Sequence, residues 1–146
     1  MHDDPQAVAL AVREAMYADD RASQALGIAV TDIGPGRATT TMTVRADMLN
    51  GFGICHGGLI TTLADSAFAF ACNSYNELTV ASGFSLDIVA PGREGDALTA
   101  TAHEVNKAGR TGVYDIEVLN QRGERVAVFR GRSYTLKGKP VIPAKA

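Results

Sequence analysis

The chain carries the stretch NGFGICHGG at residues 50–58, which runs directly into LITTLADSAFAFAC at residues 59–72. A glycine-rich turn thus brings a histidine to the start of an apolar segment, and this pattern predicts a helix over about 57–74. Asp65 is its one charged residue between Gly57 and Cys72. A helix start has free N–H groups and the positive end of the helix dipole, which suit an oxyanion. A lone charge in an apolar helix is costly unless it is used or paired. Together these features indicate acyl chemistry.

The composition indicates one globular domain spanning 1–146, because apolar residues make up 46% of the chain and charged residues only 21%. The net charge of −2, without a basic run, argues against nucleic acid as a partner. No run of about 18 apolar residues is present, so no membrane span is predicted. The first residues have neither a basic nor an apolar signal region, and we therefore expect a cytoplasmic protein.

Cysteine and histidine are too sparse for a metal centre. Cys55 and Cys72 lack a metal-binding spacing and are expected to be reduced thiols. The three histidines, His2, His56 and His103, lie far apart and form no two-ligand pattern for zinc. We therefore expect no metal and no cofactor.

The remaining pattern predicts an α+β fold in which one antiparallel sheet wraps around a long central helix, with a short N-terminal helix. The N-terminal helix is expected over 5–17, followed by a further turn at 20–25. Glycine and proline breaks separate runs rich in β-branched and alternating residues. The last four strands are expected in hairpin succession. The predicted strands cover about 26–33, 36–45, 79–90, 96–107, 111–120 and 124–136.

A helix that is apolar on nearly every side must be covered on every side. The sheet covers one side, and a second copy of the chain is the simplest cover for the other.

Asp65 has two interpretations. It can belong to a thin solvated strip with Thr61, Thr62 and Ser66, or it can lie at the floor of a pocket. In a pocket it would attack a carbonyl or activate a water.

The residues before the helix also have two interpretations. His56 and Gly57 can form an ordinary flexible helix start. Alternatively, the Gly57 N–H is an oxyanion donor that a substrate carbonyl can approach closely because glycine has no side chain. Asn50 with Gly51 is a strong turn signal, but its amide can also donate to a thioester carbonyl or hold a water.

Helix geometry adds a constraint. Gly57 and Asp65 are eight residues apart, which separates them by roughly 12 Å along a helix. Two groups that act on one carbonyl must both lie within about 3–3.5 Å of the reacting atoms. Two such helices, antiparallel about a two-fold axis, would pair Gly57 of one copy with Asp65 of the other.

The order of elements and the motifs resemble the hotdog fold, and more narrowly the phenylacetate-degradation branch of hotdog acyl-CoA thioesterases. The resemblance covers roughly residues 10 to 137. It rests on MLNG at 48–51, CHGG at 55–58, LADSAFA at 63–69, ACNS at 71–74, VAS at 80–82, PG at 91–92, GD at 95–96, TGVYDIE at 111–117 and FRG at 129–131.

This resemblance implies hydrolysis of acyl-CoA thioesters, with aryl-acetyl-CoA favoured. Asp65 matches the family's catalytic carboxylate, Gly57 its oxyanion-hole amide, and His56 and Asn50 its supporting polar groups. Ser82 matches a hydroxyl that orients a water. The family uses no metal or redox cofactor and usually forms tetramers as dimers of dimers. Together with the helix geometry, this leads us to expect a homodimer or homotetramer with active sites shared between subunits.

Two further expectations concern the substrate. The family's coenzyme A contacts match the turn that contains Lys107, Gly109, Arg110 and Thr111, whose cations and hydroxyl suit phosphates. The acyl pocket is expected to be apolar and aromatic, formed by Phe52, Ile54, Leu59 and Phe68. The alternative is that Leu59 and Phe68 are core residues that never touch the substrate, which is the usual role of apolar helix positions.

Two alternative functions remain open at this point. One is a hotdog hydratase or dehydratase, in which the histidine and the carboxylate form an acid/base pair. The other is a non-catalytic acyl-CoA sensor, against which the intact Asp65 argues.

Overall fold

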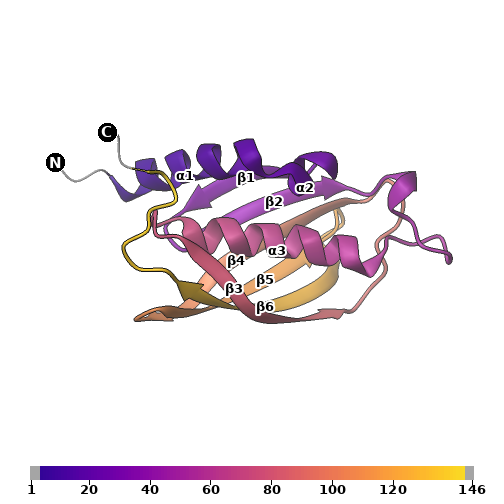
Figure 1. Cartoon of the computed structure of the whole chain (residues 1–146). Helices are drawn as coiled ribbons and strands as arrows, with labels where there is room; N and C mark the ends of the chain where they lie inside the picture. Colours follow the sequence, from indigo (N-terminus) through magenta and orange to yellow (C-terminus); the bar gives the residue numbers. More distant parts are fainter. Residues whose placement is uncertain (1–3, 144–146) are drawn as a thin grey trace.

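The computed structural model describes residues 4–143, and within them every predicted helix and strand is present (Figure 1). The ends of the predicted domain, residues 1–3 and 144–146, lie outside the described residues. The helices are α1 (Pro5–Asp19), α2 (Arg21–Ala25), the 3₁₀ turn η1 (Ala46–Met48) and α3 (Gly57–Asn73). The strands are β1 (Ala29–Gly34), β2 (Arg37–Thr43), β3 (Thr79–Ile88), β4 (Ala97–Ala108), β5 (Thr111–Leu119) and β6 (Arg125–Thr135).

The largest difference from the predicted boundaries is at β1, which starts at Ala29 instead of residue 26. The chain leaves α2 through Gly27, whose φ of 68° lies in the left-handed region that favours glycine. The N–H of Gly27 donates to the Gln24 carbonyl, and that of Ile28 to the Ser23 carbonyl. These residues therefore end the helix and cannot begin the strand.

The strands form one antiparallel six-stranded sheet in the order β1-β2-β4-β5-β6-β3. The expectation of four strands in hairpin succession is wrong for the first of them, because β3 pairs with β6 and not with β4. Instead, the residues between β3 and β4 form hydrogen bonds with the residue that follows β2, on the other side of the sheet. Gly95 N–H donates to the Val44 carbonyl, and Val44 N–H to the Asp96 carbonyl. These bonds start β4 beside β2 and leave β3 as an edge strand.

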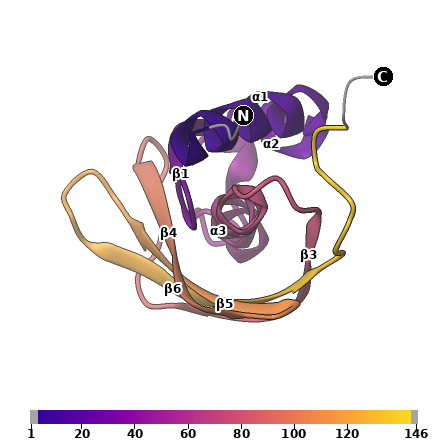
Figure 2. The same cartoon turned by 90° about the vertical axis from the view of Figure 1, so that its left-hand side faces the viewer.

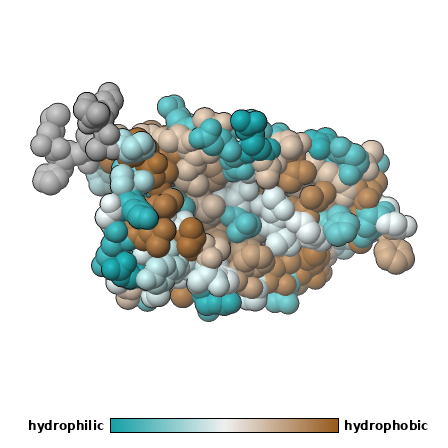
Figure 3. Space-filling view, viewed as in Figure 1, coloured by the Kyte–Doolittle hydropathy of each residue, from teal (hydrophilic) through white to brown (hydrophobic). Residues whose placement is uncertain are grey.

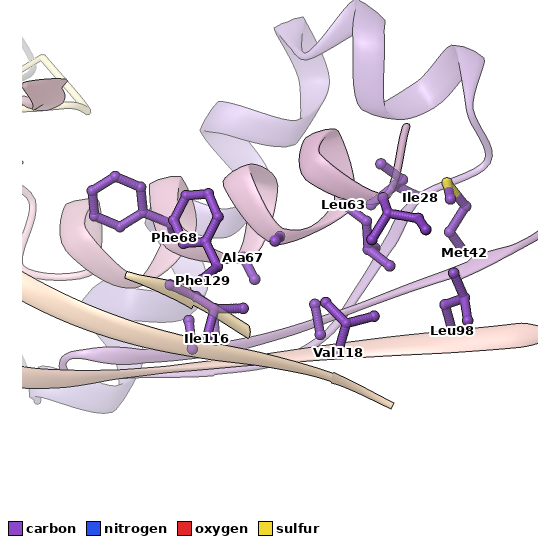
Figure 4. Close-up of a cluster of buried hydrophobic side chains, with 14 of the residues drawn as sticks. Ile28, Met42, Leu63, Ala67, Phe68, Leu98, Ile116, Val118 and Phe129 are labelled. Atoms are coloured by element: carbon purple, nitrogen blue, oxygen red, sulfur yellow. The ribbon is translucent and has the colours of Figure 1, made fainter. Parts of the chain in front are cut away.

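The sheet curls around α3, as the end-on view shows (Figure 2). Side chains that alternate inward from the strands meet the buried side chains of the helix. Phe68 of α3 lies between two rings of the sheet, with ring centroids 5.6 Å from Tyr114 and 5.8 Å from Phe129. A Cβ at Gly131 would lie 2.8 Å from the Phe68 ring, so β6 needs a glycine there. Figure 4 shows part of this core, including Ile28, Met42, Leu63, Ala67, Phe68, Leu98, Ile116, Val118 and Phe129.

The opposite side of α3 is covered in part by the chain itself. Helices α1 and α2 lie over it (Figure 2) and contact it. Ser23 of α2 and Ser66 of α3 are both buried, with their hydroxyl oxygens 3.0 Å apart. The N-terminal helices therefore cover part of the α3 surface that we expected a second copy of the chain to cover. None of the helices described is long and apolar enough to span a membrane.

Candidate active site

The N-terminus of α3 is built by the turn that precedes it. His56 is the N-cap, and its Nδ1 accepts a hydrogen bond from the Gly58 N–H at 3.2 Å. The His56 N–H donates to the Met48 carbonyl, which fixes the direction in which the chain enters the helix. Within residues 4–143 the Gly57 N–H has no hydrogen-bond partner. One backbone donor at the positive end of the helix is thus left for an outside acceptor.

The loop before the helix depends on Asn50. Its side-chain oxygen accepts from the N–H groups of Phe52 at 2.9 Å and Ile54 at 3.3 Å. The turn interpretation of Asn50 is therefore confirmed for this oxygen. Because both contacts are backbone donors, the amide nitrogen must point the other way, and in the described part of the chain it donates to nothing. Asn50 can hold the loop and still offer an amide donor.

Asp65 is half-buried on α3, and among the described residues its carboxylate has neither a hydrogen bond nor an ion pair. Burial raises the pKa of the Asp65 carboxyl, and the charge of Asp20 raises it further. Of the neighbours in the strip that was one interpretation of the sequence, Thr61 and Thr62 are half-buried like Asp65, whereas Ser66 is buried and does not belong to it. Thr61 and Thr62 donate back to the helix carbonyls of Gly57 and Gly58, at 2.8 and 2.9 Å. Ser66 is only 8% exposed.

Helix α3 is continuous from Gly57 to Asn73. Gly57 and Asp65 therefore remain roughly 12 Å apart along one axis, as the sequence predicted. His56 and Asn50 lie at the Gly57 end. A single chain therefore brings three of the four predicted catalytic residues to one end of the helix and leaves Asp65 more than two turns away.

The predicted coenzyme A turn lies at the other end of α3. Gly109 has a φ of 60° in the turn between β4 and β5, and the Thr111 hydroxyl donates to the Ala108 carbonyl at 3.2 Å. Lys107 is 3.7 Å from a Glu77 oxygen and 4.7 Å above the Tyr75 ring, both just after α3. The Arg110 side chain has no partner within residues 4–143 and is exposed. The turn is thus distant from Gly57 of the same chain.

Ser82 lies at a bulge of the edge strand β3, where the pairing with β6 shifts between Ala81 and Gly83. Its hydroxyl donates to the Arg132 carbonyl at 3.2 Å, and the residue is exposed. Bulges re-aim side chains at sheet edges. Within one chain, however, this hydroxyl contacts none of the other predicted site residues.

The expected acyl pocket is not assembled within one chain. Phe68 is 1% exposed and belongs to the core, so its assignment to the pocket is wrong, because a ring packed against Tyr114 and Phe129 cannot meet a substrate. Phe52 is 91% exposed at the loop tip. Two hollows of about 370 and 450 Å³ lie elsewhere, one on β3–β6 around Arg130 and one between α1 and β1. Neither is lined by a predicted site residue.

Two contacts at the site were missed by the sequence interpretation. A Cβ at Gly57 would lie 2.9 Å from Cδ1 of Ile88, so the end of β3 borders the free amide. Asp20 lies close enough to Asp65 to raise its pKa. Asp20 precedes a short helix and could have been recognised as an N-cap, but its nearness to Asp65 depends on how α2 packs on α3.

Most residues of strand β3 are exposed, and within residues 4–143 no other strand pairs with its outer edge. Its large apolar side chains are nearly half exposed: Val80 47%, Phe84 44% and Ile88 45%. Figure 3 shows apolar patches on the side of the molecule on which α3 and β3 are seen in Figure 1. Long apolar edge strands are rarely left open in native proteins.

Comparisons with known proteins give consistent results. Residues 52–127 match the family model described as Thioesterase superfamily. The chain is 50% identical over 124 residues to the acyl-coenzyme A thioesterase PaaI of Escherichia coli K12, which covers 85% of this chain and 89% of the relative. The solved structure of the E. coli PaaI protein, from the phenylacetic acid degradation operon, superposes with a TM-score of 0.91 at 46% identity, covering 93% of this chain and 99% of that chain. A Streptococcus mutans protein solved with acetyl-CoA bound has a TM-score of 0.73 at 26% identity, covering 77% of this chain and 90% of its own.

Proposed function

The chain belongs to the thioesterase superfamily, and from that premise we propose that it hydrolyses acyl-CoA thioesters, with aryl-acetyl-CoA such as phenylacetyl- or hydroxyphenylacetyl-CoA as substrate. The observation that carries this proposal is the 50% identity to an acyl-CoA thioesterase over 85% of the chain. The site is consistent with it, because a free amide at a helix start and an unpaired carboxylate are the groups that thioester hydrolysis needs.

The thioester carbonyl oxygen accepts a hydrogen bond from the Gly57 N–H. This donor, with the helix dipole behind it, stabilises the negative charge that grows on the oxygen as the carbonyl is attacked. A side chain at position 57 would occupy the approach to the amide, where Ile88 already limits the space. The free amide nitrogen of Asn50 and the ring of His56 support the same end of the helix.

The carboxylate comes from the partner subunit. Asp65 of the partner subunit takes a proton from a water, the water oxygen bonds to the carbonyl carbon, and the carbon–sulfur bond breaks. The thiolate of coenzyme A leaves and receives the proton, so the products are a free carboxylic acid and coenzyme A. In the alternative, the same carboxylate attacks directly and water then hydrolyses the mixed anhydride. In either case we assign to Ser82 the role of orienting the water.

The proposed assembly is a homodimer, or a homotetramer made of two such dimers, with active sites shared between subunits. Two observations support it. The roughly 12 Å between Gly57 and Asp65 is too long for one carbonyl. Phe84 of β3 stacks on the core ring of Phe129 and Ile88 lies beside Gly57 of α3, yet these side chains are 44% and 45% exposed. Two α3 helices that run antiparallel about a two-fold axis would cover these side chains and bring Gly57 of one subunit to Asp65 of the other.

In this arrangement the turn with Lys107, Gly109, Arg110 and Thr111 lies near the Gly57 end of the partner's helix, because the turn is at the opposite end of its own α3 (Figure 1). It is therefore suitably placed for the phosphates of coenzyme A.

A panel of acyl-CoA thioesters tests the proposal, with release of free thiol as the readout. We expect phenylacetyl-CoA to exceed acetyl-CoA in kcat/KM by roughly tenfold or more, because burial of a phenyl ring is worth roughly 1.5–3 kcal/mol. Hexanoyl- and benzoyl-CoA separate ring recognition from simple chain length. Equal rates across the panel would contradict the aryl pocket. Hydration of crotonyl-CoA without thiol release would favour the hydratase alternative.

Asp65→Asn is the matched negative control. It keeps the shape of the side chain and removes its basicity, so we expect a loss of about 10² or more in kcat. Wild-type turnover in this variant would remove Asp65 from the mechanism.

A further inference from the structure

The junction between α1 and α2 carries a carboxylate that the mechanism above does not use. Asp20 is the N-cap of α2, and its two oxygens accept from the Ser23 N–H at 3.0 Å and the Ser23 hydroxyl at 2.7 Å. Within the part of the chain that the structure describes, no cation lies within ion-pair distance of it. The negative charge of Asp20 is therefore not neutralised by a neighbour.

Hydrogen bonds connect this carboxylate to the helix that bears Asp65. The Ser23 hydroxyl is 3.0 Å from the Ser66 hydroxyl, and both serines are buried. Ser66 follows Asp65 directly in α3. The connection Asp20–Ser23–Ser66 thus packs α2 onto α3 at the position next to the catalytic carboxylate.

We propose, on the basis of the function proposed above, that Asp20 is a positioning residue for the hydrolysis: it fixes α2 on α3 through Ser23 and Ser66, and it holds a second negative charge beside Asp65. A like charge disfavours the ionised form of a carboxyl group and makes its conjugate base stronger. The charge of Asp20 acts on Asp65 in this direction, in addition to burial. Asp20 therefore moves the acidic limit of the pH range in which Asp65 is an ionised base above the limit that burial alone would give.

Other titratable groups near α3 do not replace Asp20 in this role. On the sheet, Glu104 accepts a hydrogen bond from the Tyr114 hydroxyl at 3.1 Å. This pair lies near the C-terminal end of α3, beyond Asp65. On α3 itself, burial raises the pKa of Cys72 to about 12, so it remains a neutral thiol. In the proposed dimer the partner's His56 also faces this site. His56 is present in the wild type and in any variant at position 20, so a comparison of the two isolates the effect of Asp20.

The test is Asp20→Asn. Asparagine keeps an oxygen for the Ser23 N–H, and its amide nitrogen can donate to the Ser23 hydroxyl oxygen where the carboxylate now accepts. The charge is thus removed while the Ser23 hydroxyl can still bond to Ser66. We expect the acidic limb of the pH profile of kcat/KM to move to lower pH, with the melting temperature close to the wild-type value. Asp19→Asn is the matched control: Asp19 is an adjacent, exposed carboxylate at the end of α1. An unchanged limb in Asp20→Asn, or an equal shift in Asp19→Asn, would overturn the proposal.

A second measurement does not depend on turnover. The Asp65 carboxyl carbon can be titrated by NMR in the wild type and in Asp20→Asn, and its midpoint should fall in the variant. If Asp65→Asn retains activity, the proposed mechanism fails while this titration still tests the influence of Asp20. If Asp65→Asn is inactive and the midpoint does not move, only the role of Asp20 fails.

Discussion

A Cβ atom on Gly57 would lie 2.9 Å from Cδ1 of Ile88, so a side chain at the first residue of α3 fits only if the tip of the last residue of β3 moves. Real Cβ contacts are essentially never this short. The free amide at the helix start is thus bordered on one side by the apolar end of an edge strand. This contact links the proposed oxyanion donor to the strand that we expect at the subunit interface.

Gly57→Ala is therefore expected to fold and to lose activity. The tip of Ile88 is flexible and the residue is 45% exposed, so it can move aside. The added methyl group, however, stands where the substrate carbonyl approaches the amide. We expect kcat to fall roughly tenfold or more, somewhat less than the loss of an oxyanion donor itself, which costs about 10²–10³. Initial rates with phenylacetyl-CoA measure this.

The matched control is Gly58→Ala. A Cβ at Gly58 would lie 3.4 Å from Nδ1 of His56 and meet nothing closer. Its activity should therefore stay near that of the wild type. Equal losses in the two variants would mean that the helix start as a whole, and not access to the Gly57 amide, is sensitive to substitution.

The elements of the fold were predictable because glycine and proline mark their ends and the strands alternate between apolar and polar side chains. The sequence also placed Gly57 and Asp65 on one helix. The partner of β3 was not predictable, because it depends on bonds such as Gly95 N–H to Val44 that are distant in sequence. The position of Asp20 near Asp65 was not predictable either, because it depends on how α2 packs on α3. The role of Phe68 was also not predictable, because a ring in the core and a ring in a pocket wall can occupy the same helix position.

Asp65→Asn should stabilise the fold at neutral pH while it abolishes turnover. Burial raises the folded-state pKa of Asp65 above its unfolded value. The stability linked to this carboxyl is therefore fully present below the unfolded pKa and is lost as the pH rises through the folded pKa. At pH 7 the wild type holds a half-buried, unpaired charge that asparagine lacks. We expect a higher melting temperature for the variant at pH 7.

The gain should shrink at about pH 3, where the wild-type carboxyl is protonated in both states. Thermal melts at the two pH values measure this, and Asp19→Asn serves as a control in which an exposed carboxylate is removed. A melting temperature below that of the wild type at pH 7 would show that the assembled enzyme stabilises the Asp65 charge.

The edge of β3 should control assembly. Sedimentation of the wild type should show a dimer or tetramer, and a fully active monomer would contradict the shared site. Val80→Glu places a charge on the open edge strand, where Val80 is 47% exposed. We expect it to raise the dissociation constant of the dimer and to lower activity in parallel, since charged side chains on edges oppose pairing.

Val105→Glu is the matched control for this change. Val105 is 50% exposed and lies at the bulge of β4, which β5 and β6 separate from β3. The same substitution there should leave the mass and the activity unchanged. If Val80→Glu stays assembled and active while Val105→Glu dissociates, the interface lies on another face of the sheet.

The two cations of the β4–β5 turn should contribute unequally to coenzyme A binding. Lys107 is already engaged by Glu77 and Tyr75, whereas the exposed Arg110 guanidinium has no partner within residues 4–143. Only Arg110 can take a phosphate without first giving up another contact. We expect Arg110→Ala to raise KM for phenylacetyl-CoA roughly tenfold, or about 1.4 kcal/mol, with kcat nearly unchanged. Lys107→Ala should raise it less.

A truncated thioester that lacks the nucleotide, such as the phenylacetyl thioester of N-acetylcysteamine, separates phosphate binding from other effects. Arg110→Ala should not change its KM, because the group that Arg110 contacts is absent. The wild type should also lose affinity for the full substrate as salt is added, and Arg110→Ala should lose less, since exposed charge pairs are screened. An equal rise in KM for both substrates would place the nucleotide phosphates elsewhere and leave the turn as a solvated hairpin.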